Sequence, residues 1–254
     1  MAERAAGPGR VGRRRALDEA EVVDAALRLL DRGGVEAVSV RGVAAGIGVA
    51  PNTVYTYFPD KAALLRALAE RVLAEVDHAA AGSAGLPWRD RVHALAADLR
   101  ARLLARPGAV GLLLSAPMDG PHALALGETL LAVLGEAGLA PREAARACYL
   151  LIVQVLGSVA LEVAELEEGP VPAERERVAA RREALRAVPA EHFPRTAAMA
   201  DTVAEYISTE QFTWSIDRVL DGLTAVRPAP TGDAPGTDGT GAPGTGTPGR
   251  GRRS

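Results

Sequence analysis

Gly48 lies between two short segments whose apolar residues recur at helical spacing, and this arrangement restricts the fold more than any other feature of the chain. The apolar positions are Val43, Ala44 and Ile47 before the glycine, and Val54 and Phe58 after it. Residues three or four apart share one face of a helix, so each segment has a side to bury. Glycine adopts the backbone conformations that tight turns require. The pattern therefore predicts two short helices joined by a tight turn.

Local signals place the starts of these two helices. Ser39 can cap the first through its hydroxyl, and Pro51 suits the first turn of the second, where its missing N–H costs nothing. The outward, polar side of the second helix consists of Asn52, Thr53, Thr56 and Tyr57. Two short helices joined in this way form a helix-turn-helix, whose second helix enters the major groove of DNA. We therefore interpret residues 39–61 as a DNA-reading unit.

Flanking helices complete this N-terminal region. One is expected from Asp18, with Glu21 as its capping-box partner, to Gly33-Gly34. Another opens at Pro59-Asp60, and its inner side carries Leu64, Leu65, Leu68, Val72 and Val76. Ala, Leu and Val dominate the 48% of hydrophobic residues, while aromatic residues are only 4%, which favours helix over sheet.

This region resembles the tetracycline-repressor family. The resemblance runs from about Leu17 to Val76 and is most specific in Val-Tyr-Thr-Tyr-Phe at residues 54–58 and in Asp60-Lys61 followed by Leu64. It implies an all-α fold. In that fold, an N-terminal three-helix helix-turn-helix DNA-binding domain is linked by a fourth helix to a helical ligand-binding and dimerisation domain.

The resemblance also implies which residues contact DNA. By position they are Arg41, Pro51, Asn52, Thr53, Tyr55, Thr56, Tyr57 and Lys61. Phosphate contacts fix the register of such a protein, and base contacts specify the sequence that it reads. The alternative for Arg41 and Lys61 is an ordinary solvated charge, and for Tyr57 it is helix packing. Thr56 departs from family members that have a larger aromatic residue or a histidine here, so no base preference is carried over.

The net charge and the cysteine content limit the partners and the cellular compartment that can be expected. The net charge is −3, so affinity for nucleic acid must come from a local basic patch. The single Cys148 excludes an internal disulfide and a thiolate metal cluster, and it suits a reducing cytosol. No apolar stretch follows the N-terminal arginines, so no secretory signal is expected. We expect a cytoplasmic protein.

The chain divides into four parts on composition. They are a disordered basic arm at 1–16, the DNA-binding domain at 17–77, a ligand-binding and dimerisation domain at 88–226, and a disordered Gly/Pro/Thr-rich tail at 228–254. Arg13-Arg14-Arg15 in the arm is either solvated or reaches DNA beside the reading unit. Helices in the second domain are expected at 88–105, 108–116, 120–138, 141–167, 173–187, 195–207 and 209–226. The highly charged stretch 167–195 is expected to be a mobile connection with one exposed helix.

The second domain resembles, more loosely, the C-terminal domain of tetracycline-repressor-type proteins. The resemblance implies a homodimer formed by a four-helix bundle, with helices 141–167 and 209–226 from each subunit. Residues 150–163 are apolar on nearly all sides, which a surface helix could not be. The alternatives are a buried helix in a monomer and a membrane span. Gln154, Ser158 and Glu162 disfavour the span.

Polar residues in this apolar domain are candidates for an effector pocket, because a ligand can satisfy a buried polar group. The candidates are His93, His122, Tyr149, Gln154 and Ser158, with Trp88 and Met118 as apolar walls. The alternative for each is core packing or surface exposure. The family's ligands for a drug-bound magnesium ion fall at or near Leu112, Val153 and Leu161, which cannot bind metal. We therefore expect no metal or cofactor, and a mainly apolar small-molecule effector.

These features predict a sequence-specific transcriptional regulator that binds a palindromic DNA operator. We expect a repressor that an effector releases from DNA; the alternative is a ligand-independent regulator or an activator. An enzyme is not expected. The four histidines and one cysteine form no recognised catalytic constellation, and GxSxG and HExxH are absent from the sequence. A formal GxGxxG at residues 244–249 is not expected to bind a dinucleotide, because no strand is expected before it and no helix after it.

Overall fold

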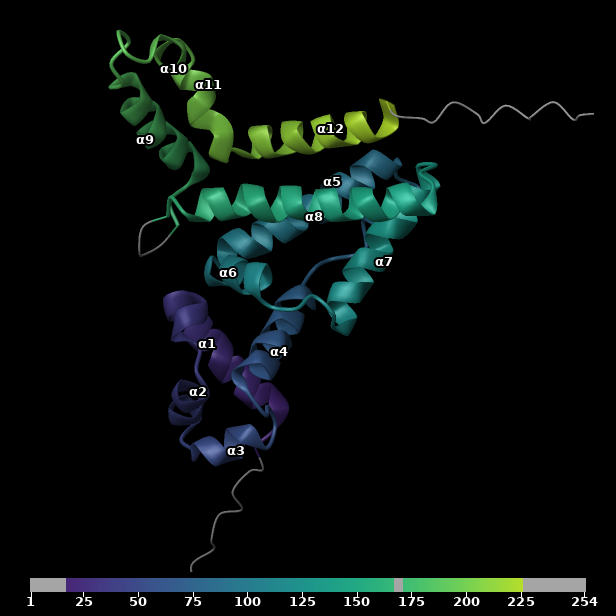
Figure 1. The fold of residues 1–254 in the computed structure, drawn as a ribbon, viewed down its shortest axis with the longest axis vertical. Helices are drawn as coiled ribbons and strands as arrows, with labels where there is room; N and C mark the ends of the chain where they lie inside the picture. Colours follow the sequence, from purple (N-terminus) through teal and green to yellow (C-terminus); the bar gives the residue numbers. More distant parts are fainter. Residues whose placement is uncertain (1–16, 167–170, 226–254) are drawn as a thin grey trace, which may run out of the picture.

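The computed structural model describes residues 17–166 and 171–225, and all regular structure in these ranges is helical (Figure 1). The N-terminal helices are α1 (Glu19–Ala37), α2 (Val40–Ile47), α3 (Pro51–Tyr55) and α4 (Lys61–Leu73). The remaining helices are α5 (Trp88–Ala105), α6 (Gly108–Ser115), α7 (Pro121–Glu136), α8 (Pro141–Val163), α9 (Glu174–Arg186), α10 (Pro194–Ala198), α11 (Ala200–Ala204), η1 (Glu205–Ile207) and α12 (Thr209–Ala225). The expected arm at 1–16 and tail at 228–254 lie outside the described residues.

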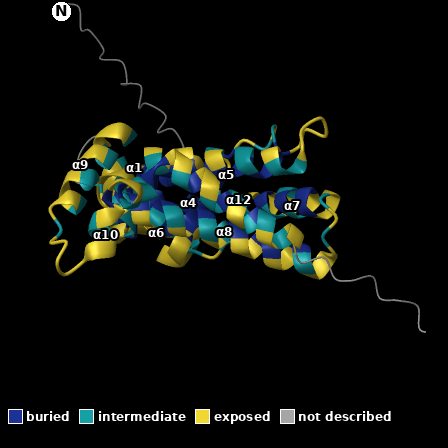
Figure 2. Ribbon diagram, turned by 90° about the horizontal axis from the view of Figure 1, so that it is seen from above, coloured by how far each residue is buried: buried dark blue, intermediate teal, exposed yellow. Residues whose placement is uncertain are grey.

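Helices α1 to α4 form one end of an elongated molecule, and α5 to α8 with α12 form the other (Figure 1). Helices α8 and α12 run side by side, and α9 to α11 form a separate projection beyond their ends. No apolar residue of α9 or α10 is buried (Figure 2). The expected all-α fold, with an N-terminal helix-turn-helix and a helical second domain, is therefore confirmed.

Capping and turn residues act as expected in α1 and α2. The Asp18 carboxylate accepts from the Glu21 N–H at 2.8 Å, and the Glu21 carboxylate accepts from the Asp18 N–H, which completes the capping box. The Ser39 hydroxyl accepts from the Gly42 N–H at 3.1 Å. Gly48 has a φ of 70°, a left-handed conformation that an L side chain rarely adopts. Its turn sets α3 at an angle to α2.

Helix α1 continues beyond Gly33-Gly34, where the sequence predicts its end. Helical dihedral angles do stop there, since Gly34 has a φ of 63°, but one further helical turn continues to Ala37. Gly108, at the start of α6, packs directly on this kink. A Cβ atom at Gly108 would lie 2.5 Å from the Leu30 carbonyl oxygen. The two domains therefore approach each other here at backbone distance.

The other departures lie at the C-terminal end. Three short helical pieces from Pro194 to Ile207 replace the single helix expected at 195–207, with the break at Met199. Helix α8 ends at Val163 rather than at residue 167. The Glu165 carboxylate follows at once, and negative charge is unfavourable at the negative end of the helix dipole.

Helix α8 is the one helix in the described part of the chain that is long and apolar enough to cross a membrane, judged by length and composition alone. Its packing accounts for that composition, because it contacts α5, α6, α7 and α12. Its Glu162 is buried and paired with Arg100 of α5. This ion pair also holds α8 against α5.

Candidate nucleic-acid interface and effector cavity

The helix-turn-helix presents a small polar surface on α3. Val54 is fully buried and Phe58 is nearly so, which fixes one side of α3 in the hydrophobic core beside α2. On the other side, Pro51 and Asn52 are exposed and Thr53 is half-buried. Arg41, Tyr55, Thr56 and Lys61 are also exposed. Seven of the eight residues expected at DNA are therefore accessible, and they lie within one short stretch of chain.

Tyr57 is the exception among these eight residues. Its hydroxyl donates to the carbonyl of Leu17, just before α1, and its ring packs against the core. The structure thus favours the packing alternative for this tyrosine. In the last turn of α3, the Thr56 hydroxyl donates to the Thr53 carbonyl at 2.7 Å, and its oxygen can still accept a bond.

Two cations border this surface. Arg41 lies in the first turn of α2, and Lys61 is the first residue of α4, directly after the Asp60 cap. Neither has an ion-pair partner within residues 17–166 and 171–225. Exposed cations without carboxylate partners on both sides of α3 are the local basic groups that phosphate binding needs.

A small aliphatic cavity lies inside the second domain, between α5, α7 and α8. Its lining consists of Val92, Leu95, Ala96, Leu99, Leu126, Leu130, Leu151, Ile152 and Val155. Its volume is about 30 Å³, close to the space of one water molecule. An organic ligand is far larger, so its entry would require the three helices to separate.

None of the seven residues expected at an effector lines this cavity. Trp88 begins α5 beneath the Arg89 guanidinium, Met118 is half-buried against the core, and His122 is exposed at the start of α7. His93 bonds Asp217 of α12 at 2.8 Å, and Tyr149 is 71% exposed. Only Gln154 and Ser158 lie together, one turn apart on α8.

Gln154 and Ser158 line a second, polar pocket of about 170 Å³ between α8, η1 and α12. The Gln154 amide nitrogen donates to the hydroxyls of Ser158 and Ser215, both at 3.0 Å. The bond to Ser215 ties α8 to α12, and the two bonds together support the alternative of a satisfied polar contact for Gln154 and Ser158.

A buried charge cluster, made of Arg100, Glu162 and Arg177, lies beside this pocket. The Arg100 guanidinium binds both carboxylate oxygens of Glu162, at 2.9 and 3.0 Å. Arg177 of α9 binds the same carboxylate at 2.7 Å. All three side chains are at least nine-tenths buried. The cluster therefore holds α5, α8 and α9 together.

The neighbours of the cluster have altered pKa values. Burial opposes ionisation of Glu174, but bonds from the hydroxyl and N–H of Thr209, together with nearby Arg100, lower its pKa overall. Burial and the hydrogen bond to Glu165 raise the pKa of Tyr206 to about 12. Both groups thus keep their usual protonation states at neutral pH, and no group of three or more metal-ligating side chains occurs in the described ranges.

Known proteins resemble both halves of the chain. Residues 22–68 match the family described as bacterial regulatory proteins, tetR family. Residues 82–227 match the family described as tetracyclin repressor-like, C-terminal domain.

A curated relative is an HTH-type transcriptional regulator of Saccharopolyspora erythraea, which is 34% identical over 146 residues, or 58% of this chain and 61% of the relative. Another is the HTH-type transcriptional repressor DrrR1 of Streptomyces coeruleorubidus, which is 30% identical over 58% of this chain and 54% of the relative. The matches thus span little more than half the length of these curated relatives.

The solved structures include a possible TetR family transcriptional regulator from Streptomyces coelicolor. It is 34% identical and superposes with a TM-score of 0.71, over 83% of this chain and 100% of that chain. The agreement covers the helix-turn-helix and the helical second domain together. The chain therefore belongs to the tetracycline-repressor family of bacterial regulatory proteins.

Proposed function

We propose that this protein is a cytoplasmic, dimeric repressor of transcription that an apolar small molecule releases from its DNA operator, and that it is not an enzyme. The observation that carries the proposal is the exposed polar side of α3, which is fixed by the buried Val54 and Phe58 and bordered by Arg41 and Lys61. A short helix with this polarity fits the major groove, and the flanking cations fit the phosphates. Family membership and the repressor DrrR1 among the relatives support the same function.

The reading residues are proposed with roles that follow from their exposure. Asn52 and Thr53 would contact base edges, since an Asn side chain can bind adenine with two hydrogen bonds. Tyr55, which is 49% exposed, would bind a phosphate through its hydroxyl. Arg41 and Lys61 would bind phosphates on either side, with Pro51 and Thr56 against the backbone. Tyr57 is proposed to support α3 from within.

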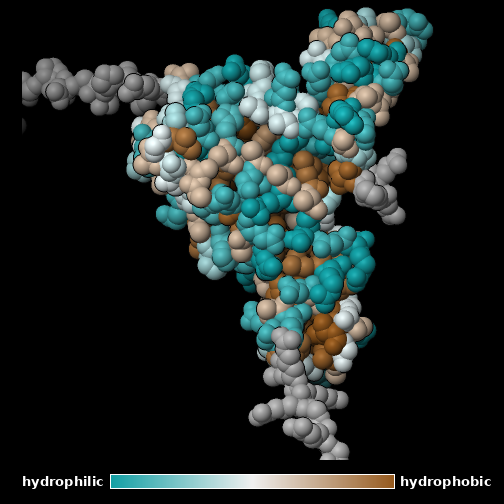
Figure 3. All heavy atoms as spheres, turned by 180° about the vertical axis from the view of Figure 1, so that it is seen from behind, coloured by the Kyte–Doolittle hydropathy of each residue, from teal (hydrophilic) through white to brown (hydrophobic). Residues whose placement is uncertain are grey.

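The dimer is proposed to form through α8 and α12. Tyr149, Val153, Gly157 and Leu161 follow one another at four-residue spacing, and all four are exposed. No atom lies within 4 Å of the Gly157 Cβ position, so a partner helix can approach closely there. Trp214 of α12 is 54% exposed. Elsewhere, apolar side chains reach the surface mostly as separate patches among polar ones, as Figure 3 shows for one face.

Substitutions on α3 test the proposed operator contacts. Asn52→Ala and Tyr55→Phe are each expected to weaken operator binding about tenfold, because a base or phosphate contact contributes about 1–3 kcal/mol. The measurement is a mobility shift on a duplex selected by the protein from a random-sequence pool. Arg175→Ala, whose side chain is 87% exposed on α9, is the control and should bind normally. Unchanged binding in both α3 variants would remove this assignment.

The lining of the aliphatic cavity indicates the effector class. It offers no polar side chain to a bound ligand, so a charged group there would have no partner. Decan-1-ol and decanoate both have ten carbon atoms, but only decanoate carries a charge. We expect decan-1-ol to raise the melting temperature by about 2–4 °C per kcal/mol of binding energy, and decanoate to have little effect.

Ala96→Val adds two methyl groups within the cavity and should weaken the response to decan-1-ol. If neither compound stabilises the protein, nor any other uncharged ligand of similar size, the second candidate function is favoured, namely a regulator that acts without an effector. If decanoate stabilises the protein as much as the alcohol does, the proposed effector class is wrong.

A further inference from the structure

Helix α7 begins without a capping side chain of its own. Its N-cap residue is Gly120, and its first residue, Pro121, has no N–H. The Leu124 N–H bonds the Gly120 carbonyl at 2.9 Å, which leaves the N–H groups of His122 and Ala123 to be satisfied. Both of them bind the other domain.

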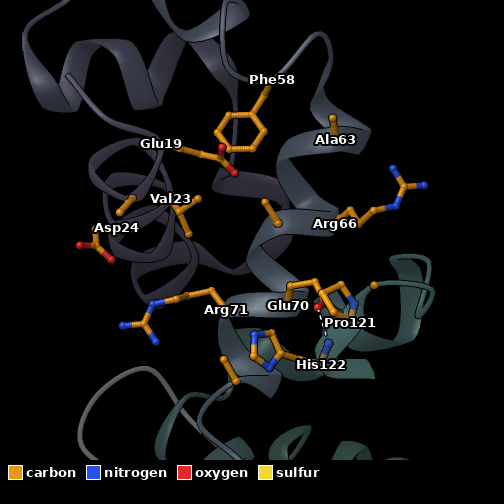
Figure 4. Close-up of a pocket in the computed structure, with 14 residues that line it drawn as sticks. Glu19, Val23, Asp24, Phe58, Ala63, Arg66, Glu70, Arg71, Pro121 and His122 are labelled. Carbon is orange, nitrogen blue, oxygen red and sulfur yellow. Dashed lines mark hydrogen bonds between the residues drawn. The ribbon is translucent and has the colours of Figure 1, made fainter. Parts of the chain in front are cut away.

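The Glu70 side chain of α4 supplies that cap. Its carboxylate oxygens accept from the His122 N–H at 2.6 Å, as Figure 4 shows, and from the Ala123 N–H at 3.1 Å. A carboxylate at this position also faces the positive end of the α7 dipole. Glu70 therefore does for α7 what an N-cap aspartate would do from within the helix.

The absence of a side chain at Gly120 makes room for this contact. Its φ of −86° and ψ of 172° suit any residue, so the backbone does not require glycine. A Cβ atom there would lie 2.3 Å from the carboxyl carbon of Glu70. Any larger residue would push the carboxylate away, and glycine is what allows the close approach.

The same helix forms a wall of the aliphatic cavity. Leu126 and Leu130 line it, about one and two turns beyond the capped end of α7. Since the cavity holds only about 30 Å³, any effector must displace one of its walls. A short rigid helix moves as a unit, so a shift of Leu126 and Leu130 would also shift the N–H groups that Glu70 binds.

A second contact ties α7 to the chain beyond α4. The Thr129 hydroxyl donates to the Ala125 carbonyl at 2.8 Å, so its oxygen is free to accept the bond from the His78 Nδ1, 2.9 Å away. Glu70 and His78 thus hold α7 on both sides of Leu126. Glu70 lies nine residues, or about 14 Å of helix, from Lys61 at the DNA-reading unit.

We propose that the Glu70 cap couples the cavity to the DNA-reading unit, with Glu70 as the positioning residue that transmits movement of α7 to α4. This inference rests on the proposed function and specifies how the effector acts. Coupling between two binding sites is reciprocal, so operator binding must in turn stabilise the start of α7.

The experiment is hydrogen exchange on the full-length protein, with and without the selected operator duplex. In the natural protein, the operator should slow exchange in residues 121–126 about fivefold or more, the lower end of usual coupling. Glu70→Ala and Gly120→Ala, which disrupt the contact from opposite sides, should still bind the duplex but lose this slowing. Arg71→Ala is the matched control, because it removes an exposed ion pair to Glu75, four residues further along the same segment, rather than a contact with α7. It should keep the slowing.

Two results would contradict the proposed coupling through the Glu70 cap. One is slowed exchange that persists in both Glu70→Ala and Gly120→Ala. Another is an operator-bound natural protein with unchanged exchange at 121–126; in either case the proposed function stands. If the natural protein selects no duplex from the pool, the proposed function fails and the coupling fails with it.

Discussion

Glu162→Gln is expected to lower the free energy of unfolding by about 3–5 kcal/mol, because it removes the charge that two buried arginines share and leaves Arg177 without a counter-charge. Glu162 is 3% exposed and binds Arg100 and Arg177 at the same time. The Nε and Nη1 atoms of Arg177 already have no hydrogen-bond partner within the described residues. The substitution keeps the size of the side chain, but it removes the charge and turns one acceptor oxygen into an NH2 donor that faces an arginine.

Urea unfolding followed by circular dichroism measures this loss. Glu183→Gln is the control, since that side chain is 75% exposed and binds only Arg186 at 3.3 Å; it should change stability by less than about 0.5 kcal/mol. Because α9 buries no apolar residue, losing the Arg177 contact should also expose α9 to trypsin. A loss below about 1 kcal/mol, with α9 still protected, would mean that the cluster does not stabilise the fold.

What could be predicted from sequence is local. The Asp18–Glu21 capping box, the Ser39 cap and the turn at Gly48 each involve residues within four positions, and all three form as expected. The hydrogen bonds that decide the remaining features span long separations. The Tyr57–Leu17, Glu70–His122 and Arg100–Glu162 bonds join residues 40, 52 and 62 positions apart. Periodicity and capping rules carry no information on such pairs.

Glu162 carried a partial signal. A carboxylate within an apolar helix implies a buried partner, but several arginines were available and only the packing of α5 against α8 selects Arg100. Glu70 gave no signal, because a glutamate on α4 is typical of a solvated helix face. Gly120, directly before Pro121, is the one nearby residue whose type is consistent with the capping role of Glu70.

The sequence predicts the effector residues among polar side chains, whereas the lining of the cavity is aliphatic. Its leucines and valines have the same spacing as ordinary core residues, and sequence cannot distinguish a filled core from one with a small gap. His93 and Gln154 instead form interhelical bonds with α12. The assignment of those seven residues to an effector remains a prediction, and the cavity is the site that we favour.

Val153→Asp is expected to separate the proposed dimer and to weaken operator binding about 100-fold or more. Val153 lies in the middle of the exposed stripe on α8, so in a dimer its carboxylate would be buried against the partner without a counter-charge. A monomer reads one half-site, and it loses the gain of 10²–10⁴ that two linked contacts usually provide. The subunits should therefore fold normally but bind a full operator no better than a half-site.

Val171→Asp is the matched control, because Val171 is 41% exposed against 46% for Val153 but lies outside α8 and α12. Sedimentation equilibrium gives the oligomeric state, and mobility shifts on full and half operators give the affinities. Gly157→Arg, four residues further along the same stripe, tests the surface sterically and should act in the same way. If both stripe variants remain dimeric at micromolar concentration, the subunits must associate through another surface, and the spacing of the two α3 helices would have to be derived from that surface instead.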